Sequence, residues 1–270
     1  GHKTNFIGKI GKDMFGDQLE AALKEVGIGT EGLMRDDEVH TTLAFVHTAP
    51  DGDREFSFYR NPGADMMLSE NDVDAEQIKN STIFHFGSLS MTDEVCRKAT
   101  RKAIAIAEEA GILMSYDPNL REPLWKSMDL AKEQISYGLE HCNILKISDN
   151  EIQWLTGRED YDEGIAMVQE KYNIPLILLS LGKTGSRAYT KNCRVEVPAF
   201  IQENTIETTG AGDTFGACIL HYLLQHGWKE YSEEELKEML TFANAAASIV
   251  TTRKGALRVM PTKEEVEAML

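Results

Sequence analysis

The feature that most constrains the fold is an alternation of short apolar runs with amphipathic helical segments across residues 83–181. The pattern predicts strands at 83–86, 113–117, 144–148 and 176–181, and helices at 91–110, 129–141, 150–156 and 160–171. Strand and helix alternating in this way form a largely parallel sheet with right-handed crossovers and helices on its faces. The sequence therefore predicts an α/β fold.

Polar or glycine-rich residues follow the predicted strands. They are Gly87-Ser88, Asp117-Pro-Asn119, Ser148-Asp-Asn-Glu151 and Ser180-Leu-Gly182. Ligands of parallel α/β sheets bind at the carboxyl ends of the strands. These four ends together predict a ligand site along one edge of the sheet.

A different pattern precedes the alternation. Residues 41–47 and 54–59 are β-branched, aromatic and partly alternating, with a turn signal at Pro50-Asp-Gly52, which predicts a hairpin in a small sheet apart from the main domain. Arg60 and Asp65 follow it among turn-forming residues. A solvated loop and contact with a ligand both remain open for these two side chains.

Further elements are predicted on both sides of this core. The end of a strand and a glycine-rich turn are predicted at 6–16, before a helix whose apolar face carries Phe15, Leu19 and Val26. The later elements are a hairpin of 187–190 with 193–197 and helices at 215–224, 233–252 and 262–270. The small residues from Asn244 to Ser248 allow close packing against a neighbour or a flat ligand, and core packing is the interpretation we favour.

Composition excludes several classes of partner. The formal net charge is -16, which argues against nucleic acid or an anionic membrane as the main partner. No apolar run approaches the roughly 20 residues that span a bilayer. The four cysteines are scattered, with no C-x-x-C pair, as in a reduced cytoplasmic protein. We expect a cytoplasmic protein that binds small molecules.

The stretch Glu207-Thr-Thr-Gly-Ala-Gly-Asp213 precedes a small-residue and apolar run that predicts a helix. Glycines allow close approach of the backbone, and a helix start offers unpaired N–H groups and a positive dipole end, which suits a phosphate. Asp213 then has two interpretations, a helix cap or a base that takes a proton from a hydroxyl beside the anion. Spacing alone does not separate them.

The spacing of residues in this sequence does not match a Walker A loop, a zinc site or a serine hydrolase motif. Gly182-Lys-Thr-Gly-Ser186 lacks the glycine that a Walker A loop needs five positions before Gly182, where Ile177 stands. The seven histidines show no zinc-ligand spacing, and no G-x-S-x-G elbow is present. A phosphate site with one carboxylate remains, together with acidic groups able to carry Mg²⁺.

These motifs closely resemble the PfkB or ribokinase-like carbohydrate kinases. The motif at 207–213 is similar to the second signature of that family, D-T-x-G-A-G-D, and residues 6–16 to the close of the first. Asp117-Pro-Asn-Leu-Arg121, Ser180-Leu-Gly182 and Arg253-Lys-Gly-Ala256 stand where the family places them. The resemblance implies one ribokinase-like domain over 1–270, a three-layer sandwich with a small β lid at about 41–60.

Within the family, the chain looks most like fructokinases. This likeness rests on Gly52-Asp53-Arg54, Tyr59 to Asp65, Asp117 to Arg121 with Leu124-Trp125, and Lys146-Ile-Ser-Asp149. It implies ATP-dependent phosphorylation of fructose on its 6-hydroxyl. Alternatives are 2-keto-3-deoxygluconate kinase or ribokinase and, from another class, an inactive nucleotide-binding fragment or pseudokinase.

The resemblance also implies roles for individual residues. Asp213 would be the base, and the N–H groups of Gly210, Ala211 and Gly212 the anion hole. Glu151 would order Mg²⁺ through water, although Ser148 replaces the asparagine of the N-x-x-E motif, and Glu207 replaces the family aspartate at a K⁺ site. The implied nucleotide contacts are Ser180, Gly182, Asn244, Ser248 and Gly255, and the implied sugar contacts are Arg60, Asp65, Asn119 and Asp213.

Two further expectations follow from the family. Its members carry a strand with a substrate-binding aspartate, lid strands and a Gly-Gly motif before the segment that matches Gly1. We therefore expect this sequence to lack the first strand and part of the lid, either because it is a fragment of a longer chain or because the numbering omits residues. Edges of lid strands in the family pair between subunits, which makes a homodimer an expectation.

Overall fold

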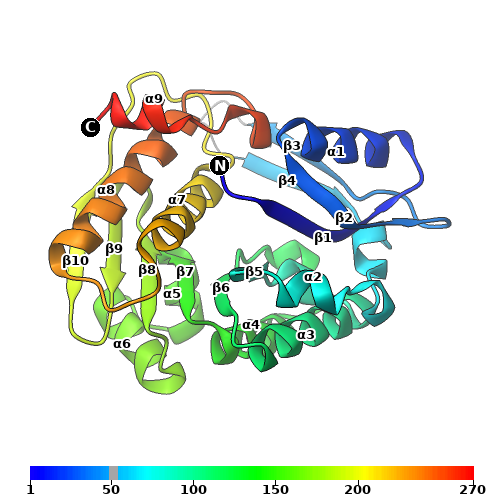
Figure 1. The fold of residues 1–270 in the computed structure, drawn as a ribbon, viewed down its shortest axis with the longest axis horizontal. Coiled ribbons are helices and arrows are strands. Elements are labelled where there is room, and N and C mark those ends of the chain that lie inside the picture. The colour runs from blue at the N-terminus through cyan, green and yellow to red at the C-terminus, as the bar shows by residue number, and fades with distance from the viewer. Residues whose placement is uncertain (49–53) are drawn as a thin grey trace. The chain divides into compact units, whose positions relative to one another are not determined.

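The computed structural model describes residues 1–48 and 54–270, and these form two compact units (Figure 1). The first unit comprises residues 1–112 and 120–137, and the second comprises 113–119 and 138–270. Each is described by itself. The turn predicted at 50–52 and the Gly52-Asp53 pair lie outside the described residues, and the single domain over 1–270 stays a prediction.

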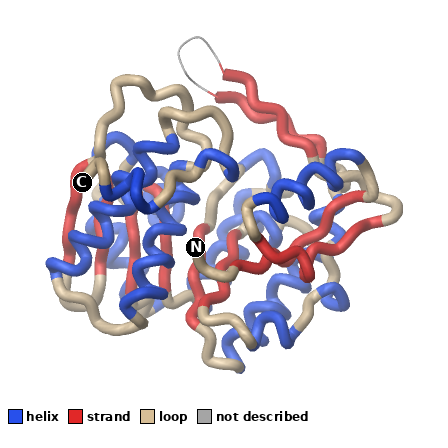
Figure 2. Tube along the Cα trace, turned by 45° about the horizontal axis from the view of Figure 1, so that its top comes forward, coloured by secondary structure: helices blue, strands red, loops and turns tan. Residues whose placement is uncertain are grey.

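The first unit contains two small sheets. Strands β1 (Thr4–Gly11) and β2 (Ile28–Asp36) pair in parallel, and β3 (Leu43–Thr48) and β4 (Arg54–Tyr59) form an antiparallel hairpin, visible in Figure 2 as a separate pair. The predicted hairpin is confirmed. Its remaining elements are α1 (Met14–Glu25), α2 (Ala75–Lys79), β5 (Ile83–Gly87), α3 (Glu94–Glu109) and the start of α4 (Met128–His141).

Strand β2 is absent from the predictions made on sequence pattern. Gly32 in β2 lies so close to β1 that an added Cβ would stand 2.8 Å from the backbone oxygen of Phe6. A glycine is therefore required where the two strands approach each other. Because glycines weaken a strand pattern in the sequence, the same requirement conceals the strand from pattern analysis.

Helix α1 begins at a well-defined cap. Asp13 accepts hydrogen bonds from the backbone N–H groups of Phe15 (3.1 Å) and Gly16 (2.8 Å) through Oδ1. Its other oxygen accepts from the backbone N–H of Thr41 at 2.7 Å. Burial opposes the charge, but these hydrogen bonds outweigh it and lower the pKa of Asp13 to about 2. One side chain thus fixes both the helix start and the approach to β3.

The second unit is built on a mixed sheet. Its strands lie in the order β10-β9-β8-β7-β6, with β6, β7 and β8 parallel and β9 and β10 antiparallel. The bounds are β6 (Leu113–Asp117), β7 (Ile144–Ser148), β8 (Leu176–Ser180), β9 (Gly185–Tyr189) and β10 (Arg194–Pro198). The predicted alternation and hairpin are confirmed, and the α/β class with them.

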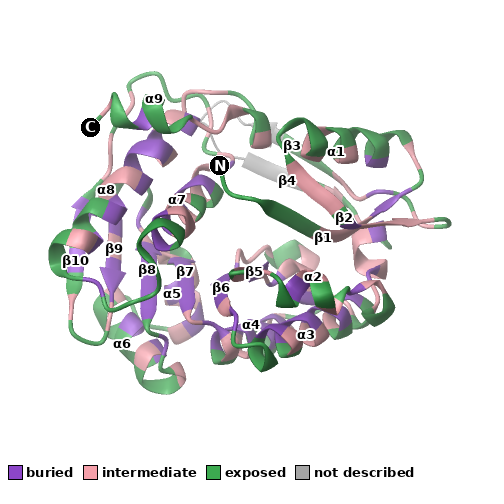
Figure 3. Cartoon of the chain, in the orientation of Figure 1, coloured by how far each residue is buried: buried purple, intermediate pink, exposed green. Residues whose placement is uncertain are grey.

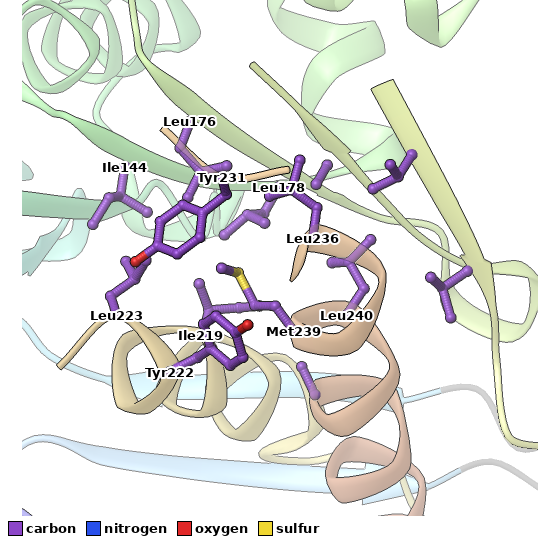
Figure 4. Close-up of a cluster of buried hydrophobic side chains, with 14 of the residues drawn as sticks. Ile144, Leu176, Leu178, Ile219, Tyr222, Leu223, Tyr231, Leu236, Met239 and Leu240 are labelled. Carbon is purple, nitrogen blue, oxygen red and sulfur yellow. The ribbon is translucent and has the colours of Figure 1, made fainter. Parts of the chain in front are cut away.

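The core of this unit lies between the sheet and two long helices, α7 (Ala211–His226) and α8 (Glu233–Val250). Figure 4 shows strand residues Ile144, Leu176 and Leu178 packed against Ile219 and residues of α8. Successive strand residues face opposite sides, and the alternate Leu145, Ile177 and Leu179 are also buried, so both faces of the sheet are covered (Figure 3). The other helices are α5 (Asp149–Thr156), α6 (Tyr161–Tyr172) and α9 (Lys263–Glu267).

Register brings the polar strand ends together. Ser148 at the end of β7 pairs with Ser180 at the end of β8, and Tyr116 in β6 pairs with Leu145 in β7. The next residues along β6 and β7 are Asp117 and Lys146. The predicted clustering of these ends is confirmed within the second unit.

Among residues 1–48 and 54–270, no helix has the length and apolar character to cross a bilayer.

Replacing Asp13 by alanine should lower the free energy of unfolding by about 1 to 2 kcal/mol, because an N-cap and the Thr41 contact are lost together. Asp74→Ala is the matched control, since Asp74 caps only the short helix α2. Urea unfolding followed by circular dichroism measures both. Equal losses for the two variants would contradict the double role of Asp13.

Candidate active site

The start of α7 has the geometry of an anion site. Gly210 is its N-cap residue and has φ +79°, a left-handed conformation that glycine adopts without strain. Thr214 donates the first intrahelical hydrogen bond to the oxygen of Gly210 at 2.9 Å. The N–H groups of Gly212 and Asp213 precede this bond and have no acceptor within the helix. With the helix dipole, they attract a negative group.

Asp213 does not cap this helix. Gly210 occupies the cap position, and within residues 1–48 and 54–270 the Asp213 carboxylate makes no hydrogen bond or ion pair. Its side chain lies in the first turn, in an exposed residue. The capping interpretation is therefore wrong, and the carboxylate is available to accept a proton.

A buried ion pair lies beside this helix start. The Nζ of Lys146 is 3.0 Å from Oδ2 of Asp117, and the two side chains are 13% and 10% exposed. Burial raises the pKa of Asp117 to about 6; the Lys146 charge opposes the shift, and the negative charges of Glu151 and Asp213 add to it. The structure thus brings the carboxylates of Asp117, Glu151 and Asp213 into one electrostatic cluster.

Lys146 reaches the backbone of the anion site. A Cβ placed on Gly212 would stand 3.2 Å from Nζ of Lys146, so the ammonium lies against the first turn of α7. Sequence pattern gave neither Asp117 nor Lys146 a role of its own. The available signal was a charged residue inside the otherwise apolar strand β7.

Glu151 is held by the start of α5. Its Oε2 accepts from the backbone N–H of Ser148 at 2.9 Å and from the hydroxyl of Ser148 at 2.7 Å, a capping box. Ser148 therefore serves as an N-cap, which gives a structural reason for serine at this position. No group of three or more histidine, cysteine, aspartate or glutamate side chains in the described chain is arranged to hold a metal.

Two of the residues implied to contact the nucleotide, Asn244 and Ser248, make hydrogen bonds within the protein. Asn244 accepts from Ser186 Oγ at 2.9 Å and donates to the backbone oxygens of Val197 and Pro198, both at 3.2 Å, and so fastens the end of β10 to α8. Ser248 is buried and donates to Ala245 O at 2.8 Å. Nucleotide contact by these two residues stays a prediction, and core packing is visible for both.

The other implied nucleotide and cation residues lie on loops of the second unit. Ser180 ends β8, and Gly182 follows with φ +54°. Oε1 of Glu207 accepts from the backbone N–H of Gly255 at 2.6 Å, which ties the start of the glycine motif to the segment after α8. That oxygen is engaged with protein, and a K⁺ site at Glu207 stays a prediction.

Of the implied sugar contacts, two pair with each other in the first unit. Nε of Arg60 donates to Asp65 Oδ2 at 2.7 Å, and its other nitrogens donate to Thr92 Oγ1 at 2.8 Å and Leu89 O at 3.0 Å. Asp65 also accepts from the hydroxyl of Thr42. The side chain of Arg60 is 6% exposed, so Arg60 is not a solvated loop residue. Asn119 lies in the second unit, half-buried, with φ 51°.

The chain is similar to known proteins over nearly all its length. A model described as pfkB family carbohydrate kinase matches residues 1–263. A protein named probable fructokinase-4 from Arabidopsis thaliana is 42% identical over 270 residues, which are 100% of this chain and 82% of that protein.

Two solved structures share the fold. Fructokinase with bound ATP from Xylella fastidiosa has a TM-score of 0.89 and 30% identity, covering 98% of this chain and 84% of that one. Fructokinase from Vibrio cholerae O395, with fructose, ADP and calcium ion bound, has a TM-score of 0.89 and 28% identity, covering 99% and 85%. The predicted ribokinase-like α/β fold is confirmed.

The raised pKa of Asp117 predicts a pH-dependent stability. Its value is 3.8 in the unfolded chain and about 6 in the folded one, so the folded state binds the proton that the unfolded state releases between these values. This contribution to stability is present below 3.8 and is lost as the pH rises through 6. Between about pH 4 and pH 7 the wild type should therefore lose more free energy of unfolding than Asp117→Asn.

Urea unfolding at several pH values measures this difference. Asp13→Asn is the control, because both of its pKa values, 3.8 unfolded and about 2 folded, lie below the window. It should follow the wild-type dependence on pH. Parallel curves for the wild type and Asp117→Asn would contradict the assignment.

Proposed function

Since this chain belongs to the pfkB family of carbohydrate kinases and is a sugar kinase, we propose that it transfers the γ-phosphoryl group of ATP to the 6-hydroxyl of fructose. The observation that carries the proposal is the unpaired carboxylate of Asp213 beside the N–H donors at the start of α7. Fructose is supported by the names of the relatives, and ATP by the bound nucleotides of the two solved structures.

The chemistry follows from this placement. Asp213 accepts the proton of the sugar hydroxyl as its oxygen attacks the γ-phosphorus, and the bond between that phosphorus and the bridging oxygen of ADP breaks. The N–H groups of Gly210, Ala211 and Gly212 stabilise the charge on the moving phosphoryl group, and the one from Ala211 donates to the oxygen of Thr208 at 3.2 Å in this structure. Such donors act mainly by positioning and electrostatics, which dominate catalysis of phosphoryl transfer.

The residues present also fit a magnesium ion bound with the nucleotide. Mg²⁺ in such sites takes one or two carboxylates, phosphate oxygens and several waters, so a full cage of protein ligands is not required. Glu151, oriented by Ser148, would hold the ion through water. When bound, the ion neutralises charge on the phosphates. A K⁺ site at Glu207 and nucleotide contacts by Ser180, Gly182 and Gly255 belong to the same proposal.

Asp213→Asn should lower kcat by about 10² to 10⁴, because the amide does not accept the proton. The melting temperature should not change, since the carboxylate has no partner within the described residues. A coupled assay of ADP release with fructose measures the rate. The control is Asp129→Asn, an exposed acidic residue in the first turn of α4, which should keep wild-type activity.

A wild-type rate in Asp213→Asn would remove the general base from the mechanism. Absence of turnover in the wild type, with ATP binding retained, would favour the inactive nucleotide-binding alternative instead. Direct titration of ATP into each protein shows whether nucleotide binding is retained.

A panel of acceptors tests the substrate. We expect fructose to have the highest kcat/KM, ahead of ribose and 2-keto-3-deoxygluconate, in the same ADP-release assay. Mass spectrometry of the product should show one added phosphoryl group. A higher kcat/KM for either competing sugar would replace fructose as the substrate and leave the sugar kinase assignment in place.

A further inference from the structure

Lys146 is a charged residue in a strand that is otherwise almost wholly apolar. Its neighbours Leu145 and Ile147 are buried, and its own side chain is only 13% exposed. Burial of an ammonium is unfavourable, and the pairing with Asp117 removes only part of that cost. An ion pair of this kind adds little stability over apolar residues of the same size, so its presence calls for another role.

The surroundings of the pair indicate that role. Nζ of Lys146 lies against Gly212, in the segment whose N–H groups form the proposed anion hole. Any residue larger than glycine at 212 would press on the ammonium, since a Cβ there would be 3.2 Å from it. The second glycine of the motif, Gly212, is therefore matched to Lys146, and the backbone donors and the ammonium lie next to each other.

The charges around Asp117 indicate where the Lys146–Asp117 ion pair lies relative to the proposed reacting groups. The negative charges of Glu151 and Asp213 both contribute to the raised pKa of Asp117, and Gly212, which lies against Lys146, directly precedes Asp213. In the proposed reaction Asp213 stands at the acceptor hydroxyl and Glu151 on the metal side of the nucleotide phosphates. The group that lies between these two positions is the phosphoryl group that is transferred.

We propose that Lys146 contacts this terminal phosphoryl group of the nucleotide, and that Asp117 is the positioning residue that holds the ammonium beside Gly212. The inference rests on the proposed function and adds two residues to it. Lys146 supplies a full positive charge, and the N–H groups supply partial positive charges. Because the contact is to the terminal group, it distinguishes a nucleoside triphosphate from a diphosphate.

The test compares the binding of ATP and ADP to purified full chains by calorimetry. In Lys146→Met the dissociation constant for ATP should rise about tenfold to a hundredfold, the size expected for a charge-assisted hydrogen bond, while that for ADP stays within about twofold. In Lys146→Arg, which keeps the charge, ATP should bind more tightly than in Lys146→Met. Equal weakening of ATP and ADP, or none, would overturn the proposal.

Lys146→Met leaves Asp117 buried without its partner and risks unfolding, so the double variant Lys146→Met with Asp117→Asn provides a neutral pair of similar shape. It should show the same selective loss of ATP binding. Asp117→Asn alone should also weaken ATP selectively, and it should add nothing further once Lys146 is replaced. Additive losses would mean that Asp117 does not act through Lys146.

Lys9→Met is the matched control. Lys9 is 14% exposed and lies 3.2 Å from Asp72, so its burial and pairing resemble those of Lys146, and it belongs to the first unit. It should keep the wild-type preference for ATP over ADP. If the wild type phosphorylates no sugar in the acceptor panel, the proposed function fails, whereas the nucleotide titrations still decide the role of Lys146.

Discussion

The register of the three parallel strands β6, β7 and β8 determines which polar residues meet at one edge of the sheet in the second unit. Because Tyr116 pairs with Leu145 and Ser148 with Ser180, the polar residues that end β6, β7 and β8 meet at one edge of the sheet. A shift by one residue would turn Lys146 to the opposite face and separate it from Asp117. The ion pair of Lys146 with Asp117 depends on that alignment, and the same alignment places the Ser148–Glu151 cap and the loop after β8 at one edge of the sheet.

An acidic protein that binds a phosphate needs local positive potential. With a formal net charge of -16, the distant field of this chain repels an anion. The start of α7 supplies positive potential through N–H groups that have no intrahelical acceptor, and Lys146 lies directly beside them. The three carboxylates nearby make the cation necessary, since Asp117, Glu151 and Asp213 would otherwise add to the repulsion.

Sequence pattern located most helices and strands because their periodicity is local, but it did not locate β2, whose glycines are required by close approach to β1. It also predicted an apolar face for α1, but Phe15 and Leu19 on that face are 41% and 48% exposed. Arg60 and Asn244 show the same limit. The family resemblance implied ligand contact for both residues, whereas the structure shows buried hydrogen bonds to residues of distant segments, Thr92 for Arg60 and Ser186 for Asn244.

Asp213 and Lys146, the two residues to which we assign roles in the proposed reaction, differ in how far the sequence alone indicates them. Asp213 stands in a contiguous motif, and the neighbours that give it meaning are the glycines directly before it. Lys146 acquires its meaning from Asp117 and Gly212, which reach it only through strand pairing and helix packing. A lone lysine in an apolar strand is a signal in sequence for a buried ion pair, because burying a charge without a partner is strongly unfavourable.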